Sequence, residues 1–375
     1  MIEPSALAPD ERLARLRLAR TPGVGPKTFL AMLQAFGNAT ESLERLPEAA
    51  RRGGRKEPLV AASADAVREE ERALAAVGGR FFVLGEKSYP DLLSAVEDPP
   101  IALSHIGDLT YMRNARFRVA IVGTRAASLN GLRFARQLAA QLAEKGCVVV
   151  SGMARGIDGE AHEGALEEKG GTIAILAGGV NHIYPTEHRD LYRRLCDKGG
   201  AAAESAWGTT PTRSSFILRN RIISGLCHAT VVVEADKKSG SLATAEFAAS
   251  QSREVCAVPG SPYEPRSVGT NHLIKQGAHP VTCLQDVLDV LPDISALNED
   301  AAGRFRPLAA APLDEREIAA AREKVRALLS PAPERIEDVA DRAGVSLRVA
   351  SVIILEMELA GKIERRRGNK VALVF

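Results

Sequence analysis

The sequence predicts an α/β fold with a doubly wound, mostly parallel sheet, flanked by a helical N-terminal domain and a winged-helix C-terminal domain. From about residue 80, short apolar runs alternate with helical stretches; the runs lie at 81–84, 119–122, 148–150, 173–177, 230–233 and 255–258. Runs that are apolar on both faces and separated by helices are typical of a parallel sheet covered on both sides. Before and after this region the apolar residues have helical spacing instead. We therefore expect a central domain at 78–291 between two helical ones.

The N-terminal domain is predicted at 1–77. Apolar residues at helical spacing in 11–36 are interrupted by 21–28, which contains two glycines and two prolines, so this stretch reads as helix, turn, helix. A further helix is expected at about 61–77. The run 51–56, Arg-Arg-Gly-Gly-Arg-Lys, is expected to form an exposed basic loop within this domain.

The C-terminal part divides into a linker and a last domain. Residues 292–314 contain three prolines and six alanines without an apolar period, which indicates a linker. Helical spacing returns in 315–329, 335–343 and 346–360, and two strand-like runs around a Gly-Asn turn close the chain. Three helices followed by a hairpin predict a winged helix at 315–375.

Composition and charge exclude several classes of protein. The chain has 375 residues, 45% of them apolar, and no apolar run approaches the roughly 18 residues of a membrane helix. The N-terminus lacks a signal-peptide pattern, so we expect a cytoplasmic protein without a membrane partner. The five cysteines include no Cys-x-x-Cys pair, which argues against a zinc knuckle or a disulfide frame. A net charge of +2 neither requires nor forbids nucleic acid.

Glycine-rich turns follow several of the predicted strands. The carboxyl ends of parallel strands share one edge of a sheet, where glycine lets an anion approach the backbone and helix N-termini offer unpaired N–H groups. We expect phosphate to bind there, with candidate residues Gly123, Thr124, Arg125, Gly152, Arg155 and Gly156. The dinucleotide fingerprint and the Walker A loop are both absent, so neither NAD nor ATP is expected.

A second group of candidates follows in the segment 213–226. Three arginines in nine residues, with one phenylalanine between them, fit a groove that tracks a nucleic-acid strand; these candidates are Arg213, Phe216, Arg219, Asn220 and Arg221. The alternatives are that Phe216 is a core aromatic and that Arg219 or Arg221 forms an ion pair inside the domain. Hydroxyl, amide and glycine groups before two later helices complete the set: Ser239, Gly240, Ser241, Thr244, Gly269, Thr270 and Asn271.

No set of residues for acid–base, nucleophilic or metal chemistry is evident. Gly-x-Ser-x-Gly and His-Glu-x-x-His patterns are missing, and no cluster of carboxylates suggests a hydrolase or nuclease. We therefore expect a protein that is not an enzyme and has no cofactor, no metal and no catalytic residue.

These motifs, in this order, resemble the DNA-processing protein A (DprA/Smf) family of bacteria. The resemblance covers most of the chain and is carried by the segments 89–93, 98–100, 119–125, 151–158, 219–226, 239–245, 257–260 and 269–274. It implies an extended Rossmann-like domain that binds single-stranded DNA, and a homodimer that protects incoming DNA and loads the RecA recombinase onto it during natural transformation.

The resemblance also assigns roles to particular residues. It places a phosphate loop on Gly123, Thr124 and Arg125, and the basic and aromatic pair of a DNA groove on Arg213 and Phe216. Many members have a basic residue after Tyr-Pro, whereas this chain has Thr186. The turn 23–25 is similar to that of helix-hairpin-helix modules, and residues 362–375 carry five basic side chains and one acidic one on the expected wing.

Two other functions stay open. One is a nucleotide-processing enzyme related to the lysine-decarboxylase-like phosphoribohydrolases, although of their Pro-Gly-Gly-x-Gly-Thr-x-x-Glu pattern the chain retains only Gly240 and Glu246. The other is a sequence-specific repressor that uses residues 315–375. The sequence does not indicate the dimer face, the RecA-contacting surface, or whether the last domain meets duplex DNA or protein.

Overall fold

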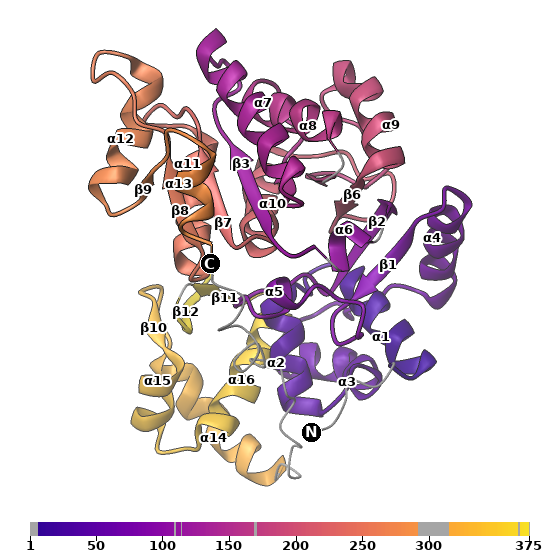
Figure 1. The fold of residues 1–375 in the computed structure, drawn as a ribbon. Helices are drawn as coiled ribbons and strands as arrows, with labels where there is room; N and C mark the ends of the chain where they lie inside the picture. Colours follow the sequence, from indigo (N-terminus) through magenta and orange to yellow (C-terminus); the bar gives the residue numbers. More distant parts are fainter. Residues whose placement is uncertain are drawn as a thin grey trace. The chain divides into compact units, whose positions relative to one another are not determined.

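The computed structural model (Figure 1) describes residues 7–108, 110–113, 115–168, 171–291, 315–366 and 368–374. The chain forms two compact units, one of Met1–Glu69 with Phe305–Phe375 and one of Glu70–Arg304. The two ends of the chain, expected as separate domains, thus belong to one unit. The predicted linker at 292–314 lies outside the described residues. None of the described helices is both long and apolar enough to cross a membrane.

Unit 2 is built on a nine-stranded sheet in the order β1-β2-β6-β5-β4-β3-β7-β8-β9. From β6 to β9 all neighbours are parallel, whereas β2 pairs antiparallel with both β1 and β6. The strands are β1 Arg80–Val83, β2 Ala102–Gly107, β3 Arg118–Val122, β4 Val148–Ser151, β5 Thr172–Leu176, β6 Gly200–Ala203, β7 Ala229–Val232, β8 Glu254–Ala257 and β9 His279–Pro280. The expected doubly wound α/β fold is confirmed.

The order of the strands reverses at β3. The chain proceeds from β3 through β4 and β5 to β6 on one side and then returns to place β7 on the other side. In register, Val119 of β3 lies opposite Val149 of β4 and Ala229 of β7. A ligand crevice in such a sheet is expected at the carboxyl ends of the two strands where the order reverses, here β3 and β7.

Helices follow the strands as the apolar spacing requires. They are α5 Asp91–Ser94, α6 Thr110–Arg113, α7 Leu129–Glu144, α8 Ile157–Glu167, η1 Thr186–His188, α9 Arg189–Lys198, α10 Arg213–Gly225, α11 Gly240–Ser250, η2 Pro265–Ser267, α12 Val268–Lys275 and α13 Leu284–Leu288. Helices α7 and α8 pack on one face of β3, β4 and β7 through a cluster that includes Ile121, Leu138 and Ile157. This cluster fixes the start of α8 directly beneath the end of β3.

Three strands have no counterpart among the six apolar runs of the sequence. Strand β6 is Gly-Ala-Ala-Ala, whose residues have low strand propensity. Strand β2 contains buried Ser104 and His105 among its apolar residues, and β9 has only two residues. Burial between neighbouring strands, rather than local propensity, makes these segments extended.

Unit 1 combines helices from both ends of the chain. Its N-terminal part contains α1 Pro9–Ala19, α2 Pro26–Phe36 and α3 Ala39–Arg52, while α4 Ala64–Ala76 spans the boundary between the units. Its C-terminal part contains α14 Glu315–Leu328, α15 Ile336–Ala343, α16 Leu347–Leu359 and a sheet of β10 Glu334–Arg335, β12 Lys370–Leu373 and β11 Ile363–Arg366. The expected winged helix is confirmed, and the positive φ angles of Gly368 and Asn369 mark its tight turn.

The expected exposed basic loop at 51–56 is wrong in part. Arg51 and Arg52 are the last residues of α3, and both bind Glu48. Gly53 is buried, and the Arg55 guanidinium donates to the Leu359 carbonyl at 3.3 Å. Half of the run is exposed, but Arg52 and Arg55 also meet partners on α14 and α16, so the run is not a free loop.

Candidate nucleic-acid interface

The turn after β3 lies at the point where the strand order reverses. The Thr124 N–H donates to the Glu234 carbonyl, which follows β7, at 2.8 Å. The Glu234 carboxylate in turn accepts from the N–H and hydroxyl of Ser128, at the start of α7. The loops after β3 and β7 are thus tied together, and one carboxylate already occupies the N-terminus of α7.

A buried carboxylate accepts backbone N–H groups from the two predicted phosphate loops, which follow β3 and β4. Asp158, on the first turn of α8, accepts the Gly152 N–H at 3.1 Å, and the N–H groups of Gly123 and Ala154 also donate to it. Burial raises the pKa of this carboxyl, and Arg219 together with these N–H groups opposes the rise. The N–H groups of Gly123 and Gly152, expected to meet phosphate, therefore bind a side chain of the protein itself.

Gly156 is required by its surroundings. Its φ is +74°, and a Cβ there would lie 2.5 Å from the Thr124 carbonyl oxygen. Its neighbour Arg155 is exposed and forms an ion pair with Glu187. The glycine brings the loop after β4 against the loop after β3, and Arg155 is available to a phosphate only in exchange for Glu187.

Two of the predicted arginines lie inside the domain. Arg219 donates to the carbonyls of Gly152, at 2.8 Å, and Ile175, and burial lowers its pKa to about 10. Arg221 pairs with Glu204 at 2.7 Å and Asp98 at 3.3 Å. Arg221 follows the alternative that the sequence left open, an ion pair inside the domain. Arg219 is also internal, but it bonds backbone carbonyls instead of forming the ion pair expected under that alternative.

The outer rim carries charges of a different kind. Arg125 is exposed, and its guanidinium carbon lies 5.3 Å from the centroid of the Phe216 ring. Arg213 is exposed at the start of α10, the helix that also holds Phe216. Within the described part of the chain, neither arginine has an ion-pair partner. The rim therefore presents two uncompensated guanidinium groups around one aromatic ring.

A tyrosine that was not among the predicted residues completes this surface. The ring of Tyr184 lies 5.5 Å from that of Phe216, and the tyrosine is 42% exposed. The signal was present in the sequence, because aromatic residues are scarce in this chain and Tyr184 lies in a polar loop. Its role was not predicted because this loop and α10 are distant in sequence, and only the fold brings the two rings together.

The remaining candidates mostly shape the backbone. Ser239 caps α11, Ser241 and Thr244 are buried, and the Asn220 side-chain amide donates to the Gly240 carbonyl at 3.1 Å. Gly240 itself is exposed in open space. Gly269 lies against a neighbouring loop, since a Cβ there would be 2.7 Å from the Ala235 carbonyl oxygen. The Thr270 hydroxyl donates to the Ser267 carbonyl. The Asn271 side-chain amide accepts from the N–H of Gly260 and donates to its carbonyl.

Among the described residues, no group of three or more His, Cys, Asp or Glu side chains is placed to bind a metal ion.

Comparison with known proteins decides the family. The family of DNA recombination-mediator protein A matches residues 80–292, which is more than half of the chain. The chain belongs to the DprA/Smf family. A DprA-like N-terminal HHH domain matches residues 9–73, and a DprA winged helix domain matches 308–369.

Individual DprA and Smf proteins agree with this membership. The DNA processing protein DprA of Bacillus subtilis is 40% identical over 210 residues, 56% of this chain and 70% of the relative. Protein Smf of Escherichia coli is 39% identical over 288 residues, 76% of this chain and 75% of the relative.

Solved structures show the same relationship. The X-ray structure of DprA from Streptococcus pneumoniae matches with a TM-score of 0.65 and 30% identity, over 77% of this chain and 100% of that one. DprA from Helicobacter pylori, whose structure is described as giving insight into its unique single-stranded DNA binding mode, matches with a TM-score of 0.51 and 30% identity, over 56% of this chain and 94% of that one.

Proposed function

We propose that unit 2 binds single-stranded DNA across the outer rim formed by Arg125, Arg213, Phe216 and Tyr184. In this role the protein catalyses no reaction. It protects incoming DNA and, as a cytoplasmic homodimer, loads RecA onto the strand in natural transformation. Membership of a DNA-processing family and the single-stranded DNA binding of the Helicobacter pylori relative support this proposal.

The observation that carries it is the contrast between paired and unpaired arginines. Arg219 and Arg221 form their hydrogen bonds and ion pairs inside the domain. Arg125, in contrast, is exposed over the Phe216 ring, and Arg213 is exposed at the start of the helix that carries this ring. A guanidinium group matches the geometry of a phosphate, and an aromatic ring stacks any base irrespective of sequence. Such a surface suits an unpaired strand, since the bases of a duplex are stacked on one another and not free to meet the ring.

Binding of a labelled oligonucleotide, measured against salt concentration, tests the rim. Arg125→Ala and Arg213→Ala should each weaken binding and reduce the slope of log affinity against log salt by about 0.7, because each removes one phosphate contact. Arg116→Ala is the matched control: Arg116 is also exposed, and it lies over Phe117 at the opposite end of β3. If both rim variants behave like the control, the proposed interface is abandoned.

The mediator role needs its own assay. RecA filament formation on strands coated with single-strand binding protein should accelerate with the wild-type chain and less so with the rim variants. Normal DNA binding without acceleration would remove RecA loading and leave the binding site intact. Release of free base from adenosine monophosphate, lost in Glu246→Ala, would instead restore the enzymatic alternative.

A further inference from the structure

Helix α16 of the winged helix is buried along most of its length. Of its thirteen residues, Leu347–Leu359, nine are buried. Side chains such as Ile353 and Met357 pack into the core of the winged helix with α14 and α15. The helix also contacts α2 and α3 of the N-terminal part of the chain. In a winged helix that reads duplex DNA, the helix at the position of α16 is the recognition helix. Such a helix must keep one face exposed in order to enter the major groove.

A glycine shows how closely the two parts approach each other. Gly53 ends α3 with φ −66° and ψ −12°, a conformation open to any residue. A Cβ at this position would lie only 1.8 Å from the Glu356 carbonyl oxygen and 2.9 Å from the Ala360 Cβ. The contact with α16 therefore requires glycine here, whereas the backbone of α3 does not.

Arginines cross this contact in both directions. Arg326 of α14 donates to the Arg52 carbonyl at the end of α3 at 2.8 Å, and Arg55 donates to the Leu359 carbonyl at the end of α16 at 3.3 Å. Each guanidinium group thus satisfies a terminal carbonyl of the other part's helix and meets the negative end of its dipole.

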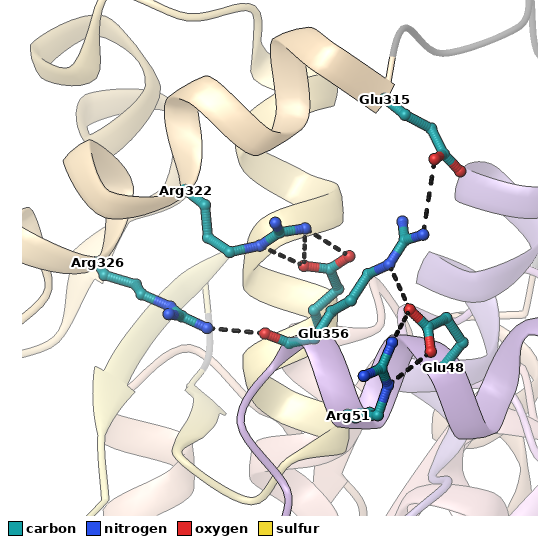
Figure 2. Close-up of polar contacts among 7 residues, drawn as sticks. Glu48, Arg51, Glu315, Arg322, Arg326 and Glu356 are labelled. Atoms are coloured by element: carbon teal, nitrogen blue, oxygen red, sulfur yellow. Dashed lines mark hydrogen bonds and ion pairs between the residues drawn. The ribbon is translucent and has the colours of Figure 1, made fainter.

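Carboxylates strengthen the same contact. The Thr28 hydroxyl of α2 donates to Glu358 at 2.9 Å, and Arg52 lies 3.6 Å from Glu315. Figure 2 shows the arginine and glutamate side chains gathered between α3, α14 and α16, with Arg322 bound to the buried Glu356. A cavity of about 640 Å³ beside these charges, lined from α2, α3, α14 and α16, leaves the contact less complete than a single core.

The chemistry of α16 suits a protein partner. Among the thirteen residues of the helix, Arg348 is the one basic residue, and Glu356 and Glu358 are acidic. A helix that reads duplex DNA needs basic and amide side chains on its outer face to meet phosphates and base edges. The helix-hairpin-helix turn, in contrast, stays open: Gly23 and Gly25 are exposed, and a Cβ on either would touch nothing within 4 Å.

We propose that the winged helix is a protein-docking module whose partner is the N-terminal helical domain of the same chain, and that α16 does not read duplex DNA. Through this contact the two ends of the chain hold each other, and contact with duplex DNA in unit 1 is left to the exposed hairpin turn.

Hydrogen–deuterium exchange of the full chain tests the docking. Gly53→Val places a wedge against α16, so exchange within 26–52 and 347–359 should rise together by about tenfold or more, while unit 2 stays unchanged. Gly25→Ala is the matched control, because Gly25 has φ −94° and open space. The rise should not depend on protein concentration. Unchanged exchange in a folded Gly53→Val chain, or exchange that slows with concentration, would overturn intramolecular docking.

A milder variant covers the case in which the wedge unfolds unit 1. Arg326→Ala removes one hydrogen bond across the contact, to the Arg52 carbonyl, together with a surface pair to Glu323 within α14. It should raise exchange in the same two segments by about two- to fivefold, as expected for the loss of one hydrogen bond across the contact. An unchanged pattern in this variant would count against docking in the same way.

Binding to a short duplex of random sequence tests the second half of the proposal. The wedge variant, or Arg326→Ala in its place, should bind the duplex no more tightly than the wild type. A gain of about tenfold, with a steeper dependence on salt, would show that α16 is a covered DNA reader and would overturn the proposal.

Discussion

The two ends of strand β3 carry the same pair of side chains but different surroundings. At the amino end Arg116 lies 5.4 Å from the centroid of the Phe117 ring, and at the carboxyl end Arg125 lies 5.3 Å from that of Phe216. Phe117 packs against the core and meets His228 edge-on, whereas Phe216 comes from a separate helix and contacts Tyr184. An arginine over a ring therefore does not by itself identify a binding site.

Each end also buries an arginine. Arg118 donates to the carbonyls of Leu226 and Met112 at the amino end, and Arg219 donates to two carbonyls at the carboxyl end. Only the carboxyl end adds the carboxylate of Asp158 and the loops framed by glycine. The carboxyl-end edge therefore differs in the internal groups that fix its loops, and these leave Arg125 and Arg213 free for a ligand.

The largest expected effect is on the support beneath the rim. Asp158→Asn should lower the free energy of unfolding of unit 2 by about 3 kcal/mol, because Arg219 stays charged and buried without its carboxylate. Denaturant unfolding of the full chain measures this change. Glu160→Gln is the control on the same helix, since the exposed pair of Glu160 with Arg136 should contribute less than about 1 kcal/mol. Equal losses in the two variants would show that Asp158 does not support the rim.

The next effect concerns the ring that distinguishes the carboxyl end. Phe216→Ala should weaken binding of single-stranded oligonucleotides by about 2 kcal/mol, roughly 30-fold, because a stacking surface is lost and Arg125 loses the ring beneath it. Phe216→Tyr keeps a stacking ring and should bind within a few-fold of the wild type. Fluorescence anisotropy at fixed salt measures both, and wild-type affinity in Phe216→Ala would make the two ends of β3 equivalent.

The fold could be predicted from the sequence because the spacing of apolar residues differs between strands and helices. The six apolar runs became β1, β3, β4, β5, β7 and β8, and the three C-terminal helices with their hairpin became a winged helix. The segments that were missed, such as the Gly-Ala-Ala-Ala of β6, have no such pattern and are extended because their neighbours bury them.

The site was less accessible to the same reasoning. The sequence indicated the edge of the sheet near which Arg125, Arg213 and Phe216 lie. It also predicted Arg219 and Arg221 as nucleic-acid contacts, although both are buried. Whether an arginine is free depends on partners such as Glu204, which precedes Arg221 by 17 residues and meets it only in the folded chain. The same limit explains the basic run at 51–56, whose partners include residues of α16 that are distant in sequence.

The effect that is smallest at neutral pH, and that grows only on acidification, comes from His162 of α8. The His162 Nδ1 lies 2.8 Å from the Thr172 hydroxyl, which itself donates to the Val149 carbonyl, so Nδ1 carries the proton and the buried Nε2 has no partner within the described structure. Burial, with smaller contributions from His188 and Arg219, lowers the pKa of His162 from 6.5 to about 3. The folded chain thus keeps this ring neutral down to acid pH.

The sign of the effect follows from where the proton binds. Between pH 6.5 and 3 the unfolded chain holds a proton on His162 that the folded chain does not. The free energy of unfolding therefore falls as the pH is lowered through this range, and above pH 6.5 this histidine causes no loss of stability. The slope due to this group should be about 1.4 kcal/mol per pH unit. His162→Asn, whose amide can donate to Thr172, should flatten the dependence of unfolding free energy between pH 6 and 4 by about this amount. An identical slope in the variant would mean that the acid sensitivity of unit 2 arises elsewhere, for example at His228 beside the amino end of β3, where burial also lowers the pKa to about 4.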